Sequence, residues 1–150
     1  MQLGAAGALH AGTVLTTPDH TATAVWRSPG RWKVTGRQMV LTLPATLRAL
    51  RGRTLVAKRT LDAIEAVHPE EPHWYLEILG TVPEQQGHGL GAAAMAPILA
   101  RCDEEGVPAY LESTKHSNVA YYERHGFRVT SELPLPDGGP SLWPMWRDPR

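Results

Sequence analysis

The sequence contains a single cysteine and no excess of charge of either sign. Cys102 has no second cysteine to pair with, which excludes an internal disulfide and a cysteine-rich metal cluster. Fifteen basic residues balance fifteen acidic ones, and a net charge of zero argues against general binding to nucleic acid or anionic membranes. The seven histidines lack the spacing of a metal site, so we expect no bound metal.

Long hydrophobic runs are also lacking. No segment approaches the roughly 20 apolar residues that span a bilayer. The first twelve residues have neither the basic n-region nor the strongly apolar h-region of a signal peptide. At 150 residues, 42% hydrophobic and 20% charged, the chain has the length and composition of one globular domain. The sequence therefore predicts a single soluble domain over residues 1–150, located in the cytoplasm.

Fourteen glycines and thirteen prolines divide the chain into predicted elements. Alternating and β-branched apolar residues predict strands at 13–17, 21–26, 74–82, 109–113, 127–133 and 141–147. Apolar residues at helical spacing, or alanine-rich and glycine-terminated segments, predict helices at 37–51, 54–67, 90–105 and 118–125. This order of elements predicts an α/β domain built on a mixed sheet.

A glycine-rich loop, residues 87–91, lies between the strongest predicted strand and the alanine-rich helix. Such a loop can bind an anion, because free N–H groups at the helix start point at phosphate oxygens and glycine allows close approach. Gly87-x-Gly89-x-x-Ala92 also satisfies the dinucleotide fingerprint, with Glu112 where a ribose-binding acid belongs. Residues 83–86 between strand and loop, and the closing β hairpin, weigh against a dinucleotide.

Two motifs, in this order, resemble those of the GNAT-type N-acetyltransferase family. The first looks like the acetyl-CoA-binding motif and reads Leu79-x-Thr81-x-Pro83-x-x-Gln86-Gly87-x-Gly89-x-Gly91. The second is similar to the family's downstream motif and reads Asn118-x-x-x-Tyr122-Glu123-Arg124-x-Gly126-Phe127. From residue 71 to 146 the chain particularly resembles puromycin N-acetyltransferase and its actinobacterial relatives, through the segments EPxWYL, GVPAYLES and YERHGF.

The resemblance implies a GNAT fold whose mixed sheet is splayed at the CoA site. It also implies transfer of an acetyl group from acetyl-CoA to a primary amine of a small molecule, by direct attack on the thioester. The loop would bind the CoA pyrophosphate, and a bulge near residues 79–81 would bind the acetyl carbonyl and pantetheine. The implied cofactor-binding residues are Leu79, Thr81, Gln86, Gly87, His88, Gly89, Leu90, Gly91, Ala92 and Asn118. Asn118 could instead cap its helix, and the glycines could form an ordinary flexible turn.

Acetyl transfer requires a neutral amine, a stabilised oxyanion and a protonated or solvated leaving thiolate. By resemblance Tyr122 is the leading general acid, whereas the adjacent Tyr121 faces another direction and is expected to pack in the core. Glu112 and Glu77 are the candidate general bases, with Glu112 ranked first. Either carboxylate could instead be a surface charge or part of a structural ion pair.

The family's N-terminal strand and two helices have no counterpart before the predicted hairpin at residues 13–26. In the family these elements form one sheet edge and much of the acceptor wall. Two interpretations follow: the chain is a truncated or mis-started product, or a partner such as a second copy of the chain covers the exposed edge, because an open edge invites pairing. The alternative is an acyl-CoA-binding domain that lacks an acceptor site and does not catalyse.

Overall fold

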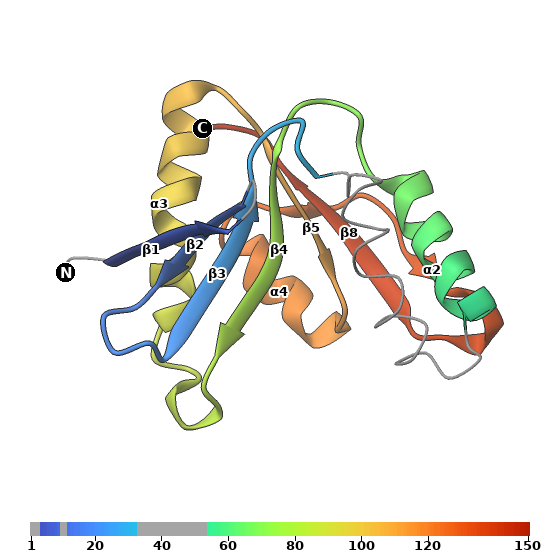
Figure 1. Cartoon of the computed structure of the whole chain (residues 1–150), viewed down its shortest axis with the longest axis horizontal. Coiled ribbons are helices and arrows are strands. Elements are labelled where there is room, and N and C mark those ends of the chain that lie inside the picture. The colour runs from blue at the N-terminus through green and yellow to red at the C-terminus, as the bar shows by residue number, and fades with distance from the viewer. Residues whose placement is uncertain (1–3, 10–11, 33–53) are drawn as a thin grey trace.

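An eight-stranded mixed sheet is the framework of the computed structural model, which describes residues 4–9, 12–32 and 54–150 (Figure 1). Its strand order is β1-β2-β3-β4-β5-β8-β6, and β7 pairs with β8. The strands are β1 (Gly4–Leu9), β2 (Gly12–Thr16), β3 (Ala22–Arg27), β4 (Trp74–Thr81), β5 (Ala109–Ser113), β6 (Arg128–Val129), β7 (Leu133–Pro134) and β8 (Ser141–Arg147). All neighbouring strands are antiparallel except β4 and β5, which are parallel.

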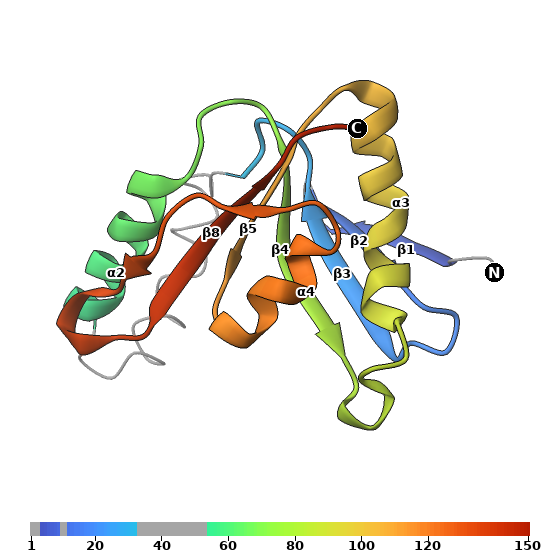
Figure 2. The ribbon, with the colours of Figure 1, turned by 180° about the vertical axis from the view of Figure 1, so that it is seen from behind.

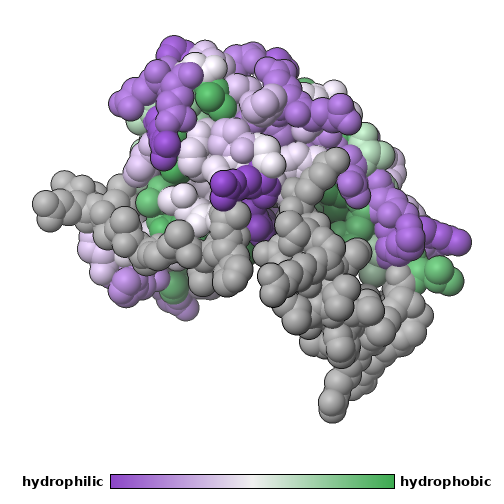
Figure 3. Space-filling model, turned by 45° about the horizontal axis from the view of Figure 1, so that its top comes forward, coloured by the Kyte–Doolittle hydropathy of each residue, from purple (hydrophilic) through white to green (hydrophobic). Residues whose placement is uncertain are grey.

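Three described α-helices accompany the sheet: α2 (Thr54–Val67), α3 (Leu90–Glu105) and α4 (Val119–Glu123). Helix α3 packs across β2, β3 and β4, and α4 contacts β6, so both lie on the face that Figure 2 brings forward. Helix α2 lies at the other end of the molecule, against the 3-10 turn η3 (Pro136–Gly138). Seen from its top, the molecule presents mainly hydrophilic side chains in its described part (Figure 3).

The hydrophobic core lies between α3 and the sheet. Helix α3 contributes small and flexible side chains, which allow close approach to the strands. The fully buried members include Trp26, Ala94, Met95, Cys102 and Met145. The glycine after the helix, Gly106, adopts φ +65° and donates its N–H to the carbonyl of Cys102, as expected for a left-handed helix terminator.

The predicted hairpin and the helix at 54–67 are confirmed, as is the mixed sheet. The predicted helix at 37–51 lies outside the described residues. The sequence assigned no element before residue 13, whereas β1 occupies Gly4–Leu9 and forms the sheet edge. A segment rich in glycine and alanine has low intrinsic strand preference, so its pairing with β2 decides its structure.

A buried arginine ties the end of β8 to α3. The Arg147 side chain is 5% exposed and donates through Nη1 and Nη2 to the two carboxylate oxygens of Asp103, at 2.8 Å each. Its Nε donates to the carbonyl of His125 at 3.0 Å. These hydrogen bonds hold the pKa of Asp103 below its usual value.

We expect Asp103→Asn to lower the free energy of unfolding by about 2 kcal/mol at pH 7, because it removes the charge that accepts two hydrogen bonds from the buried Arg147 guanidinium. Urea unfolding measures this loss. Because the folded-state pKa of Asp103 is depressed, its contribution is present above the unfolded-state pKa and disappears as pH falls through the folded-state pKa. The matched variant Glu105→Gln removes the exposed pair with Arg101 and should have no measurable effect. Equal losses in both variants would contradict this account.

Candidate active site

The sheet opens between its two parallel strands. Strands β4 and β5 pair only at Trp74–Ala109 and Tyr75–Tyr110. Beyond these pairs β4 continues with β3 as far as Thr81, while β5 continues with β8. Helix α4 lies beside the opening in both ribbon views (Figures 1 and 2). The splayed sheet that the sequence predicted is therefore confirmed.

The edge of β4 that faces this opening carries free backbone donors. The Val82 N–H donates to the Thr21 carbonyl at 2.8 Å, on the β3 side of the strand. Because backbone groups alternate between the two edges of a strand, the N–H groups of Leu79 and Thr81 face the opened edge. Neither has a β5 partner, since the pairing with β5 has already ended at Tyr75.

A β-bulge lies in β4, two residues earlier than the resemblance suggested. Trp26 pairs with Leu76 and Val25 pairs with Ile78, so Glu77 is the additional residue. The bulge interrupts the alternation of side chains, and Glu77 and Ile78 are both exposed. Sequence patterning could not locate it, because a bulge is defined by the register with the partner strand.

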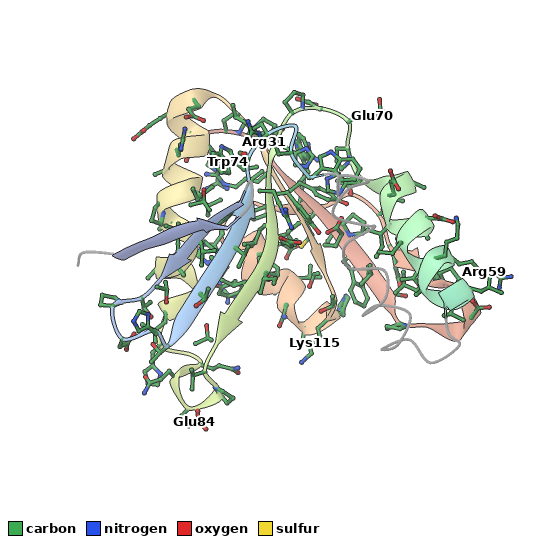
Figure 4. The ribbon with its side chains drawn as sticks, in the orientation of Figure 1. Arg31, Arg59, Glu70, Trp74, Glu84 and Lys115 are labelled. Carbon is green, nitrogen blue, oxygen red and sulfur yellow. The ribbon has the colours of Figure 1, made fainter. Side chains whose placement is uncertain are left out.

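The glycine loop is exposed at the end of the sheet where β4 and β5 part. Residues 82–89 are all exposed, and Figure 4 shows Glu84 of this loop and Lys115 beyond β5 at the same end of the molecule. Gly87 and Gly89 adopt φ +81° and +77°, a conformation that strains other residues. The Ala93 N–H makes the first helical bond, to the Gly89 carbonyl at 3.0 Å.

The first turn of α3 therefore has three backbone donors without helical acceptors, which belong to Leu90, Gly91 and Ala92. Such donors, together with the positive end of the helix dipole, suit a phosphate. The Gln86 side chain folds back and donates to the Thr81 carbonyl at 3.3 Å, while His88 is exposed. The residues present thus fit a pyrophosphate group.

The adjacent tyrosines of α4, Tyr121 and Tyr122, have different surroundings. The Tyr121 hydroxyl is buried, has no hydrogen-bond partner among the described residues, and lies 2.9 Å from where a Cβ on Gly91 would be. Burial raises the pKa of Tyr121 to about 12. Tyr122 is half-buried with its ring edge-on to Phe127, and burial raises its pKa too, so both phenols stay protonated at neutral pH.

Sequence reasoning gave Tyr121 only a packing role and missed its approach to α3. Asn118 is the residue before α4, but its side chain makes no capping hydrogen bond in the described part of the chain. Its exposed amide is therefore available to a ligand.

The two candidate bases have different surroundings. Glu77 accepts two hydrogen bonds from Arg27, Nε to Oε2 at 2.8 Å and Nη2 to Oε1 at 2.9 Å, so both its oxygens are engaged. The Glu112 side chain is only 7% exposed. Because Ala109 and Leu111 of β5 pack in the core with α3, strand alternation directs Glu112 to the opposite face of the sheet.

Glu112 is surrounded by aromatic residues that sequence reasoning did not assign to the site. Its Oε1 lies 3.2 Å from Nδ1 of His68, in the loop after α2. Tyr75 and Tyr110 flank it, and burial, reinforced by the Glu112 charge, raises the pKa of both phenols. The only local signal in the sequence was two histidines flanking the proline-rich segment before β4.

His68 and His73 are both buried and connect Glu112 to the backbone. Nε2 of His68 lies 3.1 Å from Nε2 of His73, and Nδ1 of His73 lies 2.6 Å from the Glu71 carbonyl oxygen. The contacts therefore connect Glu112 through His68 and His73 to the Glu71 carbonyl. Within the described ranges, no group of three histidine, cysteine or acidic side chains is placed to hold a metal ion.

An open mixed sheet with an exposed glycine loop at its opening is the arrangement that the sequence predicted for a GNAT-type acyltransferase. The sequence profile of the Acetyltransferase (GNAT) family matches residues 32–127, and the chain therefore belongs to this family. Members of this family use acetyl-CoA. In the described part of the structure, no helix is both long and hydrophobic enough to cross a membrane.

Two curated relatives align with this chain over only part of their own length. The chain is 30% identical over 126 residues to an uncharacterised N-acetyltransferase of Schizosaccharomyces pombe, covering 77% of this chain and 51% of the relative. It is 39% identical over 72 residues to the mycothiol acetyltransferase of Streptomyces coelicolor, covering 46% and 23%. The chain thus spans about half, or less, of the curated relatives that it matches.

A solved structure supports the fold. This structure, from Corynebacterium glutamicum, is described as a histone acetyltransferase HPA2 and related acetyltransferase. It aligns with a TM-score of 0.61 at 24% identity, covering 94% of this chain and 66% of that one.

Proposed function

We propose that this chain transfers the acetyl group of acetyl-CoA to a primary amine of a small molecule. The observation that carries the proposal is the opening of the sheet after only two β4–β5 pairs, next to an exposed loop with unpaired backbone donors. A thioester arm needs such an opening to reach the face of the sheet on which Glu112 lies. The resemblance to puromycin N-acetyltransferase, and the name of the mycothiol acetyltransferase, support a small-molecule acceptor.

The cofactor contacts follow from the free donors. The N–H groups at the start of α3, with Gly87, His88 and Gly89 before them, hold the pyrophosphate, and Gln86 keeps the loop close to the strand. The N–H groups of Leu79 and Thr81, together with the Asn118 amide, bind the pantetheine arm. When bound, acetyl-CoA supplies a thioester carbonyl as the electrophile.

Proton handling falls to Glu112 and Tyr122. A lysine-like alkyl amine has a pKa of about 10.4 and is mostly protonated at neutral pH. Glu112, on the face opposite α3, takes this proton so that the nitrogen lone pair can attack. Tyr122, protonated at neutral pH because burial raises its pKa, donates to the departing sulfur.

Calorimetry followed by a thiol-release assay tests the proposal. We expect acetyl-CoA to bind in preference to NAD, and a panel of primary amines to include some that release free thiol. Preferential binding of NAD would overturn the assignment in favour of a dinucleotide-binding module. Binding of acetyl-CoA without thiol release from any amine would identify a non-catalytic acyl-CoA-binding domain.

The two tyrosines of α4 provide a matched pair of variants. We expect Tyr122→Phe to lower kcat by about 100-fold, the lower part of the range for general acid–base catalysis, with an unchanged Kd for acetyl-CoA. Tyr121→Phe removes a buried hydroxyl without a described partner, so turnover and stability should be retained. Steady-state kinetics compares them, and the reverse pattern would move the acid role to Tyr121.

A further inference from the structure

We propose that His68, His73 and Glu112 act together as one base, in which a proton is shared between Nδ1 of His68 and the Glu112 carboxylate. The inference rests on the proposed function, because it assigns a role to two histidines behind the candidate base. His68 and His73 are positioning residues, since they act on the amine through Glu112.

The hydrogen-bond directions can be assigned from one end of the set. The Glu71 carbonyl can only accept, so Nδ1 of His73 must carry the hydrogen at the 2.6 Å contact. Burial lowers the pKa of His73, which leaves this ring neutral and its Nε2 an acceptor. Nε2 of His68 must therefore donate across the 3.1 Å contact between the two rings.

The other nitrogen of His68 then determines the proton count. Its Nδ1 lies 3.2 Å from Oε1 of Glu112, and an unprotonated nitrogen facing a carboxylate oxygen would place two lone pairs against each other. A proton between them removes this repulsion. The three side chains thus satisfy all their contacts only when they hold three protons. With two protons, every arrangement leaves one contact without a hydrogen.

The surroundings reinforce this requirement. Trp32 stacks on His68 at 3.7 Å between ring centroids, and Trp146 of β8 packs edge-on to His73 at 5.6 Å. Among the described residues, the titratable groups that face the set are Tyr75 from β4 and Tyr110 from β5.

The charged pair of Arg27 with Glu77 acts on Tyr75 and is neutral overall. The Tyr110 hydroxyl is buried and has no hydrogen-bond partner among the described residues. Both phenols face the Glu112 carboxylate and can stabilise its charge, but neither supplies the hydrogen between Glu112 and His68.

The chemical consequence concerns the strength of the base. An ordinary glutamate and an alkyl ammonium differ by about 6 pKa units, so an isolated carboxylate is a poor acceptor for the amine's proton. In the proposed set, the N–H bond of the ammonium breaks and its proton moves to the contact between Glu112 and His68. The nitrogen keeps its lone pair for attack. The set can accept this proton only when it holds two protons.

Nitrogen-15 NMR of the histidine-labelled full chain tests the proton count without requiring turnover. At pH 7 we expect His73 as the Nδ1–H tautomer and a hydrogen on Nδ1 of His68. Glu112→Gln should remove that hydrogen, because the glutamine amide donates in its place, whereas Glu77→Gln should leave the signal unchanged. His73 as the Nε2–H tautomer, or a His68 signal that ignores Glu112→Gln, would overturn the proposal.

Kinetics tests the role in catalysis. His68→Asn retains an amide donor for Glu112 but cannot share its proton. We expect the acidic limb of the kcat/KM profile to move to lower pH and the plateau kcat to fall about 10-fold, with acetyl-CoA Kd unchanged. A lower plateau with an unmoved limb would indicate a merely structural role and overturn the inference.

The control is His20→Asn, which changes an exposed histidine at φ +58°, a conformation that asparagine tolerates, and should leave the profile unaltered. If the wild-type chain fails to bind acetyl-CoA, the proposed function fails. The NMR tautomers then still decide whether the three side chains share their protons.

Discussion

Replacing Gly89 with valine should weaken acetyl-CoA binding by about 10-fold or more while the chain remains folded. Gly89 precedes α3 at φ +77°, where a β-branched residue is strongly disfavoured. Valine must either strain the loop, at a cost of about 1–2 kcal/mol, or turn its backbone donors away from the phosphate. In both cases the side chain occupies the surface that the pyrophosphate would approach. Calorimetry measures the binding, and urea unfolding the stability.

Gly106 offers a matched control at the other end of the same helix. It has φ +65°, and, like Gly89, an added Cβ would meet nothing within 4 Å among the residues described. Gly106→Val should therefore cost similar stability but leave acetyl-CoA binding unchanged. If both variants lose binding equally, the effect is on the helix as a whole. If Gly89→Val binds normally, the loop does not hold the phosphate.

The parts of this site that the sequence predicted are those encoded by contiguous residues. The strand, glycine loop and helix from Trp74 to Glu105 lie next to one another in the chain, so their order and turn chemistry predict their arrangement. The opening of the sheet followed from resemblance, through the same segment and the motif at 118–127. Local propensity and motif spacing suffice where the donors belong to the backbone.

The parts that sequence reasoning missed depend on contacts between distant segments. His68 precedes Glu112 by 44 positions and meets it only because β4 and β5 are neighbours. The bulge at Glu77 is set by its register with β3, and the Tyr121 hydroxyl is placed by the approach of α4 to α3. No periodicity of a single segment contains this information. Contacts between distant segments also explain why the two candidate bases, Glu77 and Glu112, differ so much in burial, at 32% and 7% exposed.

That difference leads to the prediction for the base. We expect Glu112→Gln to lower kcat by about 100- to 10,000-fold, the range for removal of a general base, with little change in the Kd of acetyl-CoA. Stability should change little, because the glutamine amide can donate to Nδ1 of His68 and preserve the hydrogen bonds of a neutral set. Thermal unfolding checks this point, and thiol-release kinetics with a reactive amine measures kcat.

Glu77→Gln is the comparison variant for Glu112→Gln, because it makes the same chemical change on the neighbouring strand. Both oxygens of Glu77 already accept hydrogen bonds from Arg27, so the carboxylate is engaged in an ion pair that is partly open to solvent. Its loss should lower kcat far less than the loss of Glu112. A larger loss from Glu77→Gln would make Glu77 the base, and would mean that the buried histidines support a carboxylate that the amine never reaches.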